Sequence, residues 1–285
     1  MKSSWLRMIC FLGGLLMLLP AAMAEEDDPE LLIEEIIEYV DLDAVSYGDT
    51  EWTFPVALED MSPDLVRLAN KHYLLEKDFV VQPLVTVKTR NKDGSNGGVF
   101  KASGAKMQLQ EACAEALHAM SEAALKDGLR MYLKSAYRSY QTQNTMYYNR
   151  LKKNNGRDDG WVSKPGSSDH QTGLGCDVVP RAWRDKSMNE KMASEEVCIW
   201  MAAHCHEYGF ILRYPADKED LTEINFEPWH MRYVGIPVAT YIMNNGLCLE
   251  EFTQELQAAI EDFISRGGDP SYVSAFVQTP SEEAD

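Results

Sequence analysis

The sequence predicts an α+β fold in which helices flank a small, largely antiparallel sheet. Several segments show the 3.6-residue spacing of amphipathic helices, and one short run alternates like a half-buried strand. Helices and strands do not alternate strictly along the chain, as they would in a parallel βαβ fold. With 285 residues, of which 45% are hydrophobic and 25% charged, the chain is long enough for one buried domain with extensions.

Acidic residues dominate the charge of the chain. The formal net charge is -18 and the isoelectric point is about 4.7, so phosphate backbones and anionic lipid head groups would be repelled. We therefore expect no nucleic-acid partner. The segment between Arg7 and Arg67 contains no lysine or arginine, and residues 25–61 are interpreted as a solvated acidic N-terminal extension.

The first 24 residues have the three parts of a secretory signal. Two basic residues precede an apolar run from residue 8 to residue 19, and a proline and the small-residue site Ala22-Met23-Ala24 follow it. The apolar run is shorter than the roughly 20 residues that span a bilayer, which favours cleavage over a membrane anchor. We expect an exported mature chain that starts at Glu25 and has no stable membrane span.

The mature chain is predicted to begin with a helix and a loop. Asp28-Pro29 is typical of a helix start, and apolar residues then repeat at helical spacing as far as Val40. From residue 41 to residue 61 the pattern is that of a loop. We place the start of the main folded domain near Ser62.

The middle of the chain predicts a helix, a strand and a second helix. Apolar residues recur with helical period between residues 109 and 124, and Gly128 follows where a left-handed residue would end the helix. Leu129, Met131 and Leu133 then alternate with polar residues, which predicts a strand with one buried face. A helix is expected at about residues 140–154.

The C-terminal half predicts two more helices and a strand. Ser194 begins one helix and Gly209 ends it, residues 210–214 follow as a strand, and a final helix covers about residues 250–266 before a polar tail. Removal of the signal leaves five cysteines, and Cys198 and Cys205 would lie about 10 Å apart on one helix, beyond disulfide reach. We interpret them as core thiols.

Groups able to carry chemistry gather in two short segments. His170 and Asp177 lie in one, and Glu227 and His230 lie in the other. A catalytic zinc ion has three protein ligands and one open position, and His170, Asp177 and His230 supply that number. Glu227 remains as a candidate general base, because a Pro-Trp turn separates it from His230. By spacing alone, a set of surface polar residues is the commoner explanation.

A family resemblance strengthens the zinc interpretation. The pattern Ser-x-His-x-x-Gly-x-x-x-Asp at residues 168–177, with Glu-Pro-Trp-His at residues 227–230, resembles the motifs of the VanY-like D-alanyl-D-alanine carboxypeptidases, which are zinc peptidases of the peptidoglycan layer. Three further segments match in the same order, namely Tyr137-Arg138-Ser139-Tyr140 with Gln143, Leu212-Arg213-Tyr214-Pro215 with Lys218, and Arg232-Tyr233-Val234-Gly235. The resemblance covers roughly residues 68–251.

The resemblance implies a role for each site residue. His170, Asp177 and His230 would bind one Zn²⁺ per chain in a central cleft, with Glu227 as general base and acid. Arg138 would hold the substrate carbonyl or terminal carboxylate, since a guanidinium matches such groups with two hydrogen bonds. Gln143 and Ser168 would make secondary substrate contacts.

Two residues depart from the family pattern. The family often has alanine where this chain has Gly175, and glycine where it has Glu223. We interpret Gly175 as a mild loosening of the backbone and expect Glu223 to face water.

The implied function is removal of the terminal D-alanine from peptidoglycan stem peptides by a zinc-dependent D,D-carboxypeptidase. Related activities stay open, namely an L,D-carboxypeptidase, a cross-link endopeptidase, or a cell-wall-binding protein without catalysis. We expect an extracellular, cell-wall-associated or periplasmic monomer. Its predicted parts are a signal (1–24), an acidic extension (25–61), a zinc carboxypeptidase domain (62–248) and a C-terminal helix with polar tail (249–285).

Overall fold

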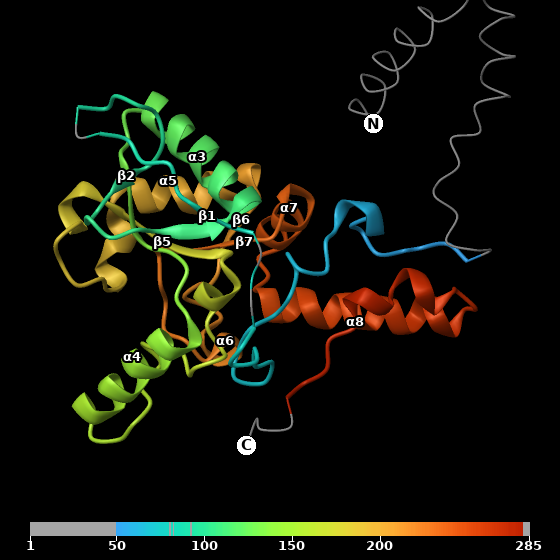
Figure 1. The fold of residues 1–285 in the computed structure, drawn as a ribbon. Helices are drawn as coiled ribbons and strands as arrows, with labels where there is room; N and C mark the ends of the chain where they lie inside the picture. The colour runs from blue at the N-terminus through green and yellow to red at the C-terminus, as the bar shows by residue number, and fades with distance from the viewer. Residues whose placement is uncertain (1–49, 80, 82, 92, 282–285) are drawn as a thin grey trace, which may run out of the picture. The chain divides into compact units, whose positions relative to one another are not determined.

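The computed structural model describes residues 50–79, 81, 83–91 and 93–281 (Figure 1). They belong to one compact unit that extends from Tyr47 to Asp285. The predicted signal and the helix predicted from Asp28 lie outside the described residues. Within the described part, no helix has the length and apolar character needed to cross a membrane.

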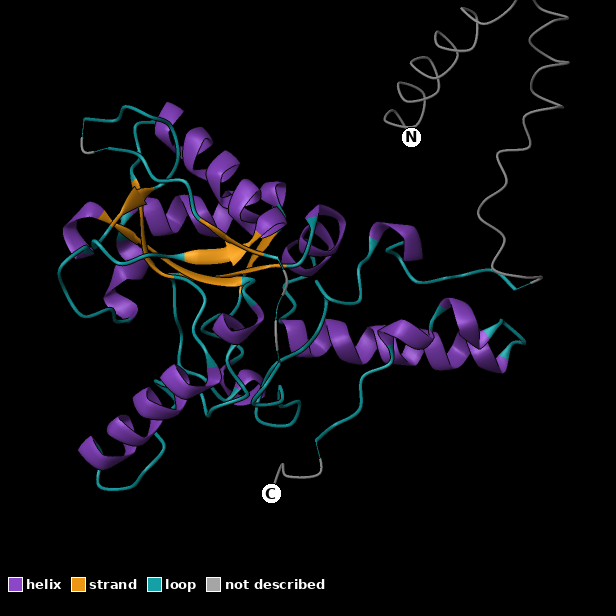
Figure 2. Cartoon of the chain, in the orientation of Figure 1, coloured by secondary structure: helices purple, strands orange, loops and turns teal. Residues whose placement is uncertain are grey.

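A five-stranded sheet forms the centre of this unit, in the order β2-β4-β5-β7-β6 (Figure 2). The short strand β2 pairs with β4 in parallel, and the other three pairings are antiparallel. β1 and β3 form a separate antiparallel pair. The strands are β1 (Leu84–Thr86), β2 (Phe100–Lys101), β3 (Gln108–Gln110), β4 (Met131–Ser135), β5 (Gly175–Pro180), β6 (Phe210–Leu212) and β7 (His230–Tyr233). The predicted α+β class with a largely antiparallel sheet is confirmed.

Helices surround the sheet, and α4 with its following loop extends away from the body of the fold (Figures 1 and 2). The α-helices are α3 (Glu111–Lys126), α4 (Tyr140–Lys153), α5 (Glu196–His204), α6 (Glu219–Thr222), α7 (Ile236–Asn244) and α8 (Leu249–Ser265). Short 3-10 helices cover Leu58–Asp60, Asp169–Thr172, Arg181–Trp183, Glu190–Ser194, Cys205–Tyr208, Pro270–Tyr272 and Ser274–Phe276. Four predicted helices thus have counterparts in α3, α4, α5 and α8.

One face of the sheet is covered by α3 and α5. Apolar side chains of both helices pack with Cys176 and Val178 of β5 and Met231 of β7 in one buried cluster. Gly209 ends the 3-10 helix after α5 in a left-handed conformation, with φ 81°. A Cβ at this position would lie 2.7 Å from the ring of Tyr233, so glycine is required where the chain turns into β6.

A second cluster forms around α7 and α8. Leu249, Phe252 and Leu256 of α8 pack with Val56 and Leu58 from the start of the described chain. The predicted domain boundaries at residues 62 and 248 therefore separate segments that share one apolar cluster. The shared core joins both flanking segments to the sheet.

The structure differs from the sequence predictions in three places. β4 is buried on both faces, because Tyr132 packs against Phe100 with ring centroids 5.3 Å apart. β6 ends at Leu212, two residues earlier than predicted. The tail after α8 is not wholly polar, since Val273 and Phe276 are buried in the second cluster.

Candidate metal centre

The register of β5 against β7 builds the centre. Asp177 and His230 are direct cross-strand partners in this antiparallel pair. Alternation along each strand turns Cys176 and Met231 to the opposite face, into the core beneath α3 and α5. The two polar side chains therefore meet on one face of the sheet, where neither helix covers them.

His170 completes a group of three buried donors. It lies on the 3-10 turn Asp169–Thr172, just before β5. Its Nε2 is 3.4 Å from Oδ1 of Asp177, and Nδ1 of His230 is 3.1 Å from the same oxygen. One ligand atom from each residue lies within 4.8 Å of the other two. The three residues predicted from the sequence are thus brought together and can hold a metal ion.

The orientation of His170 is set by a backbone carbonyl. Its Nδ1 is 2.7 Å from the oxygen of Ala136, at the end of β4. A carbonyl oxygen only accepts, so Nδ1 carries the proton and Nε2 offers a lone pair. Nε2 is buried and has no hydrogen-bond partner among the described residues. This arrangement is typical of a metal-binding imidazole, whose second nitrogen is held by an outer partner.

The spacing of the donor atoms fits zinc. Zinc bonds of about 2.0–2.2 Å in a tetrahedron place neighbouring ligand atoms roughly 3.3–3.6 Å apart. The distances of 3.4 Å and 3.1 Å to Oδ1 of Asp177 are close to this range. Two imidazoles and one carboxylate are also donors that zinc prefers. The residues present therefore fit a catalytic zinc ion with one open position.

Burial and charge keep His170 and Asp177 in the forms that bind metal. Burial and, to a smaller extent, nearby Arg138 lower the pKa of His170 to about 4. Burial acts to raise the pKa of Asp177, but His170 and His230 outweigh it and hold this pKa well below the ordinary value. At neutral pH the imidazole of His170 is neutral and the carboxyl group of Asp177 is ionised.

Glu227 lies beside this group without belonging to it. Its Oε2 is 3.6 Å from Nδ1 of His230, and the turn is closed by a hydrogen bond from the His230 amide to the Glu227 carbonyl. Burial raises the pKa of Glu227 well above its ordinary value, Asp177 raises it further, and Arg138 opposes both. A carboxyl group whose pKa is raised in this way holds a proton more readily than an exposed one, which suits a general acid and base.

A cleft of about 360 Å³ opens from these groups. Arg138, Gln143 and Ser168 all line it. Gln143 donates from Nε2 to the carbonyl of Ser163 at 2.7 Å, whereas its buried Oε1 has no partner among the described residues. The buried Nε of Arg138 is likewise unpaired within the described part of the chain. These polar atoms are therefore available to a ligand in the cleft.

Two tryptophans form an apolar wall of the cleft. Trp229 stacks on Trp161 with ring centroids 6.3 Å apart and an angle of 13° between the planes. Trp161, Met188 and Asn189 also line the cleft, and no feature of the sequence singled them out. They lie in segments just outside the motif at residues 168–177, and no spacing rule connects them to His170.

Both departures from the family pattern have a physical role. A Cβ at Gly175 would lie 2.9 Å from the Cβ of Asp169, so this glycine permits a close contact, and the interpretation as loosening is wrong. Glu223 ends α6 in the left-handed region, with φ 54°, where glycine is favoured. Its partly exposed side chain lies 3.8 Å from Lys71 and 3.5 Å from His72.

Three protein donors around one open position distinguish catalytic from structural zinc, so the fold and the centre define a zinc-dependent hydrolase. The pattern of the VanY D-alanyl-D-alanine carboxypeptidase family matches residues 106–236. YodJ of Bacillus subtilis (strain 168), a carboxypeptidase by name, is 34% identical over 195 residues, covering 68% of each chain. The chain belongs to the VanY family.

Other relatives agree with this assignment. A D-alanyl-D-alanine carboxypeptidase of Enterococcus faecalis is 34% identical over 48% of this chain and 52% of its own length. The LdcB LD-carboxypeptidase structure has a TM-score of 0.60 and 34% identity, covering 67% of this chain and 87% of that chain. A VanY D,D-pentapeptidase from a VanB-type cassette in complex with Zn(II) has a TM-score of 0.51 and 28% identity, with 66% and 98% covered.

Proposed function

We propose that this chain is a zinc-dependent D,D-carboxypeptidase that removes the terminal D-alanine from peptidoglycan stem peptides. The observation that carries the proposal is the cross-strand pair Asp177 and His230, joined by His170 and faced by the separate carboxyl group of Glu227. A protein that only bound cell wall would not need a proton-transferring group beside the metal ligands.

The proposed roles follow from the geometry. His170, Asp177 and His230 hold zinc, which when bound supplies Lewis-acid activation of water and of the scissile carbonyl. Glu227 accepts the proton of the attacking water and delivers it to the departing amine. Its raised pKa suits the second step, because the protonated form must persist near neutral pH.

The cleft residues position the peptide. Arg138 faces the substrate with two prongs of its guanidinium, directed at the terminal carboxylate or the carbonyl. Oε1 of Gln143 accepts from a substrate N–H, and Ser168 adds a polar contact on the same wall. Arg138→Lys would retain zinc and raise KM or lower kcat, because a point charge cannot make the two-pronged contact.

The direct test is hydrolysis of a defined peptide. The purified zinc-loaded protein is incubated with a pentapeptide that ends in D-Ala-D-Ala, and released D-alanine is measured with and without a metal chelator. We expect release that stops on chelation and returns when zinc is restored. Absence of release by protein shown to contain zinc would overturn the proposal.

An L,D-carboxypeptidase is the second candidate. LdcB, an LD-carboxypeptidase, has higher identity and a higher TM-score with this chain than the VanY pentapeptidase, at 34% and 0.60 against 28% and 0.51. Mass analysis of products from tripeptides, tetrapeptides, pentapeptides and cross-linked dimers separates the two activities from an endopeptidase. Trimming of the tetrapeptide alone would favour the second candidate.

Export and a monomeric state are part of the proposal. The segment 1–24 has the organisation of a cleaved signal. N-terminal sequencing of the protein recovered outside the cytoplasm should begin at Glu25, and light scattering should give the mass of one chain. An intact N-terminus in the membrane fraction would contradict cleavage.

A further inference from the structure

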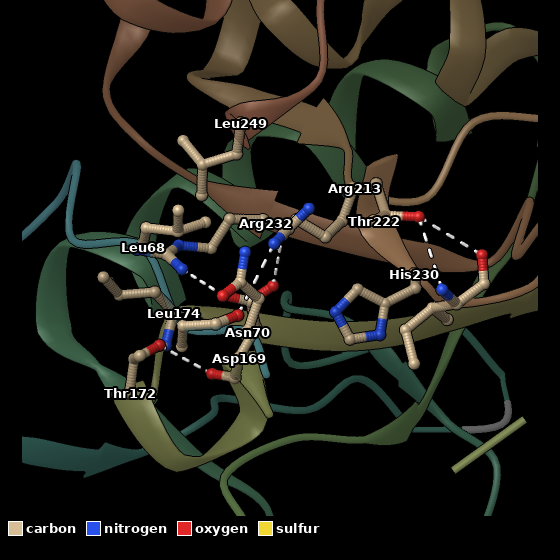
Figure 3. A network of polar contacts seen from close by, with 12 residues as sticks. Leu68, Asn70, Asp169, Thr172, Leu174, Arg213, Thr222, His230, Arg232 and Leu249 are labelled. Carbon is tan, nitrogen blue, oxygen red and sulfur yellow. Dashed lines mark hydrogen bonds and ion pairs between the residues drawn. The ribbon is translucent and has the colours of Figure 1, made fainter. Parts of the chain in front are cut away.

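Four charged side chains form a buried network next to the metal centre. Asp169, Arg213 and Arg232 are fully buried, and Glu250 is 6% exposed. Figure 3 shows Arg213 and Arg232 directed toward Asp169, close to the ring of His230. Two positive and two negative groups leave the network neutral, which is the condition under which buried charges are tolerated.

Each carboxylate of the network is held by an arginine. Arg213 donates from Nε to Oδ2 of Asp169 at 2.7 Å. Its two terminal nitrogens donate to the two carboxylate oxygens of Glu250 at 2.8 Å and 2.7 Å. Arg232 pairs with the other oxygen of Asp169. Nδ2 of Asn70 donates to Oε1 of Glu250 at 3.2 Å. The chain of contacts runs from α8 to the turn that carries a metal ligand.

The network touches both histidine-bearing segments. Asp169 directly precedes His170, and Arg232 lies two residues after His230 on the same face of β7. The amide of Arg213 donates to the carbonyl of His230 at 3.2 Å. A shift of Arg213 would therefore displace the backbone on both sides of the centre.

Segments outside the family match complete the network. Glu250 belongs to α8, beyond residue 236 where the match ends. Arg232 also donates from Nη2 to the carbonyls of Leu65 and Arg67, at 2.9 Å and 2.8 Å. A segment that precedes the family match thus contacts Arg232, and α8, which follows the match, contacts Arg213.

We propose that Glu250 is a positioning residue for the zinc site: it fixes Arg213, which fixes Asp169 and thereby the place of His170. The proposal rests on the zinc-dependent function proposed above. Through Glu250, α8 would contribute to zinc affinity, whereas a helix that only enlarged the core would not. Partners behind metal ligands typically change affinity 10-fold to 100-fold when mutated.

The test compares Glu250→Gln with Glu251→Gln. Glu251, the next residue, pairs with Lys218 at 2.9 Å and accepts from the Cys248 amide at 2.9 Å, away from Asp169. Zinc dissociation constants are measured by chelator competition, with melting temperature and circular dichroism in parallel. We expect Glu250→Gln to weaken zinc binding about 10-fold to 100-fold, whereas Glu251→Gln lowers the melting temperature and changes zinc affinity by less than about two-fold.

Two milder variants guard against misfolding. Glu250→Asp keeps the charge and should recover part of the lost affinity. Asn70→Ala removes the amide that donates to Glu250, together with the oxygen that accepts from the amides of His72 and Tyr73. If folded Glu250→Gln or Asn70→Ala has a lower melting temperature but the zinc affinity of the unmodified protein, the network only stabilises the fold and the proposal is wrong. Zinc binding without peptide cleavage would instead refute the proposed activity and leave this test intact.

Discussion

Two buried charged groups lie side by side on one face of the sheet, and they are neutralised in different ways. In the ion network, Asp169 and Glu250 are each paired with arginine side chains of the protein. In the metal centre, Asp177 and Glu227 lie near two histidines and the guanidinium group of Arg138. The polypeptide completes the charge of the first group, whereas zinc supplies positive charge to the second.

The difference appears in the pKa values of two buried carboxyl groups. Burial acts to raise the pKa of Asp169, but Arg232 and Arg213 outweigh it and lower the pKa. Burial raises the pKa of Glu227, and one arginine does not compensate for it. Two buried carboxyl groups thus have pKa values shifted in opposite directions, and the group that keeps its proton more readily is the one suited to transfer it.

Replacement of Glu227 should have the largest effect of the variants considered, and it should lower turnover without loss of zinc. Glu227→Gln keeps the shape and all three ligands, so zinc content should persist. Turnover should fall 10²-fold to 10⁴-fold, which is about 2.7–5.4 kcal/mol in the activation barrier. Metal analysis beside peptide hydrolysis checks both. Loss of zinc in this variant would mean that Glu227 is a ligand and that the centre has been assigned wrongly.

Arg213→Met should break the neutral group, which should lower the stability of the fold and weaken zinc binding as well. It leaves the carboxylates of Asp169 and Glu250 without their shared cation, which should cost about 3–5 kcal/mol in the free energy of unfolding. Denaturant unfolding measures the loss. Arg266→Met is a matched control, because the Arg266–Asp262 pair is partly exposed and its removal should cost less than about 1 kcal/mol. Equal losses in the free energy of unfolding would mean that the buried network stabilises the fold no more than an exposed ion pair does.

Gly175→Ala tests the contact between the two groups. Gly175 is the cross-strand partner of Arg232, and an added Cβ would approach Asp169 to 2.9 Å. Overpacking of this kind costs about 1–3 kcal/mol, and we expect weaker zinc binding as well. Gly104→Ala is the control, since its added Cβ would meet no atom within 4 Å. Unchanged unfolding in Gly175→Ala would show that the Asp169 turn relaxes without penalty.

The two groups should also titrate in different pH ranges. In metal-free protein the pKa of His170 is lowered to about 4 from 6.5, so the unfolded chain binds this proton first. The contribution of His170 to stability should therefore fall as the pH drops from about 6.5 to about 4, while the raised pKa of Glu227 acts in the opposite direction, and the lowered pKa of Asp169 adds a loss only below about 3.8. Unfolding measured at several pH values should give a shallower slope in His170→Ala. Identical slopes would remove His170 as the cause.

Local patterns predicted the helices and the metal ligands because their signals are short-range or carried by motifs. The periodicity of residues 109–124 and the motif at 168–177 are examples. The ion network has no such signal: Arg213 meets Asp169 across 44 positions and Glu250 across 37. These groups meet through tertiary contacts of the folded chain, and no regular spacing in the sequence connects them.

The contact of Arg213, the residue after β6, with Glu250 of α8 limits how freely parts of such enzymes can be exchanged. The family match ends at residue 236, yet Glu250 lies beyond it and neutralises a charge within it. A chimera that joined residues 106–236 to the C-terminal helix of a relative without this acid would leave the two terminal nitrogens of Arg213 without their carboxylate, next to the metal centre. Working hybrids should therefore transfer Arg213 and Glu250 together.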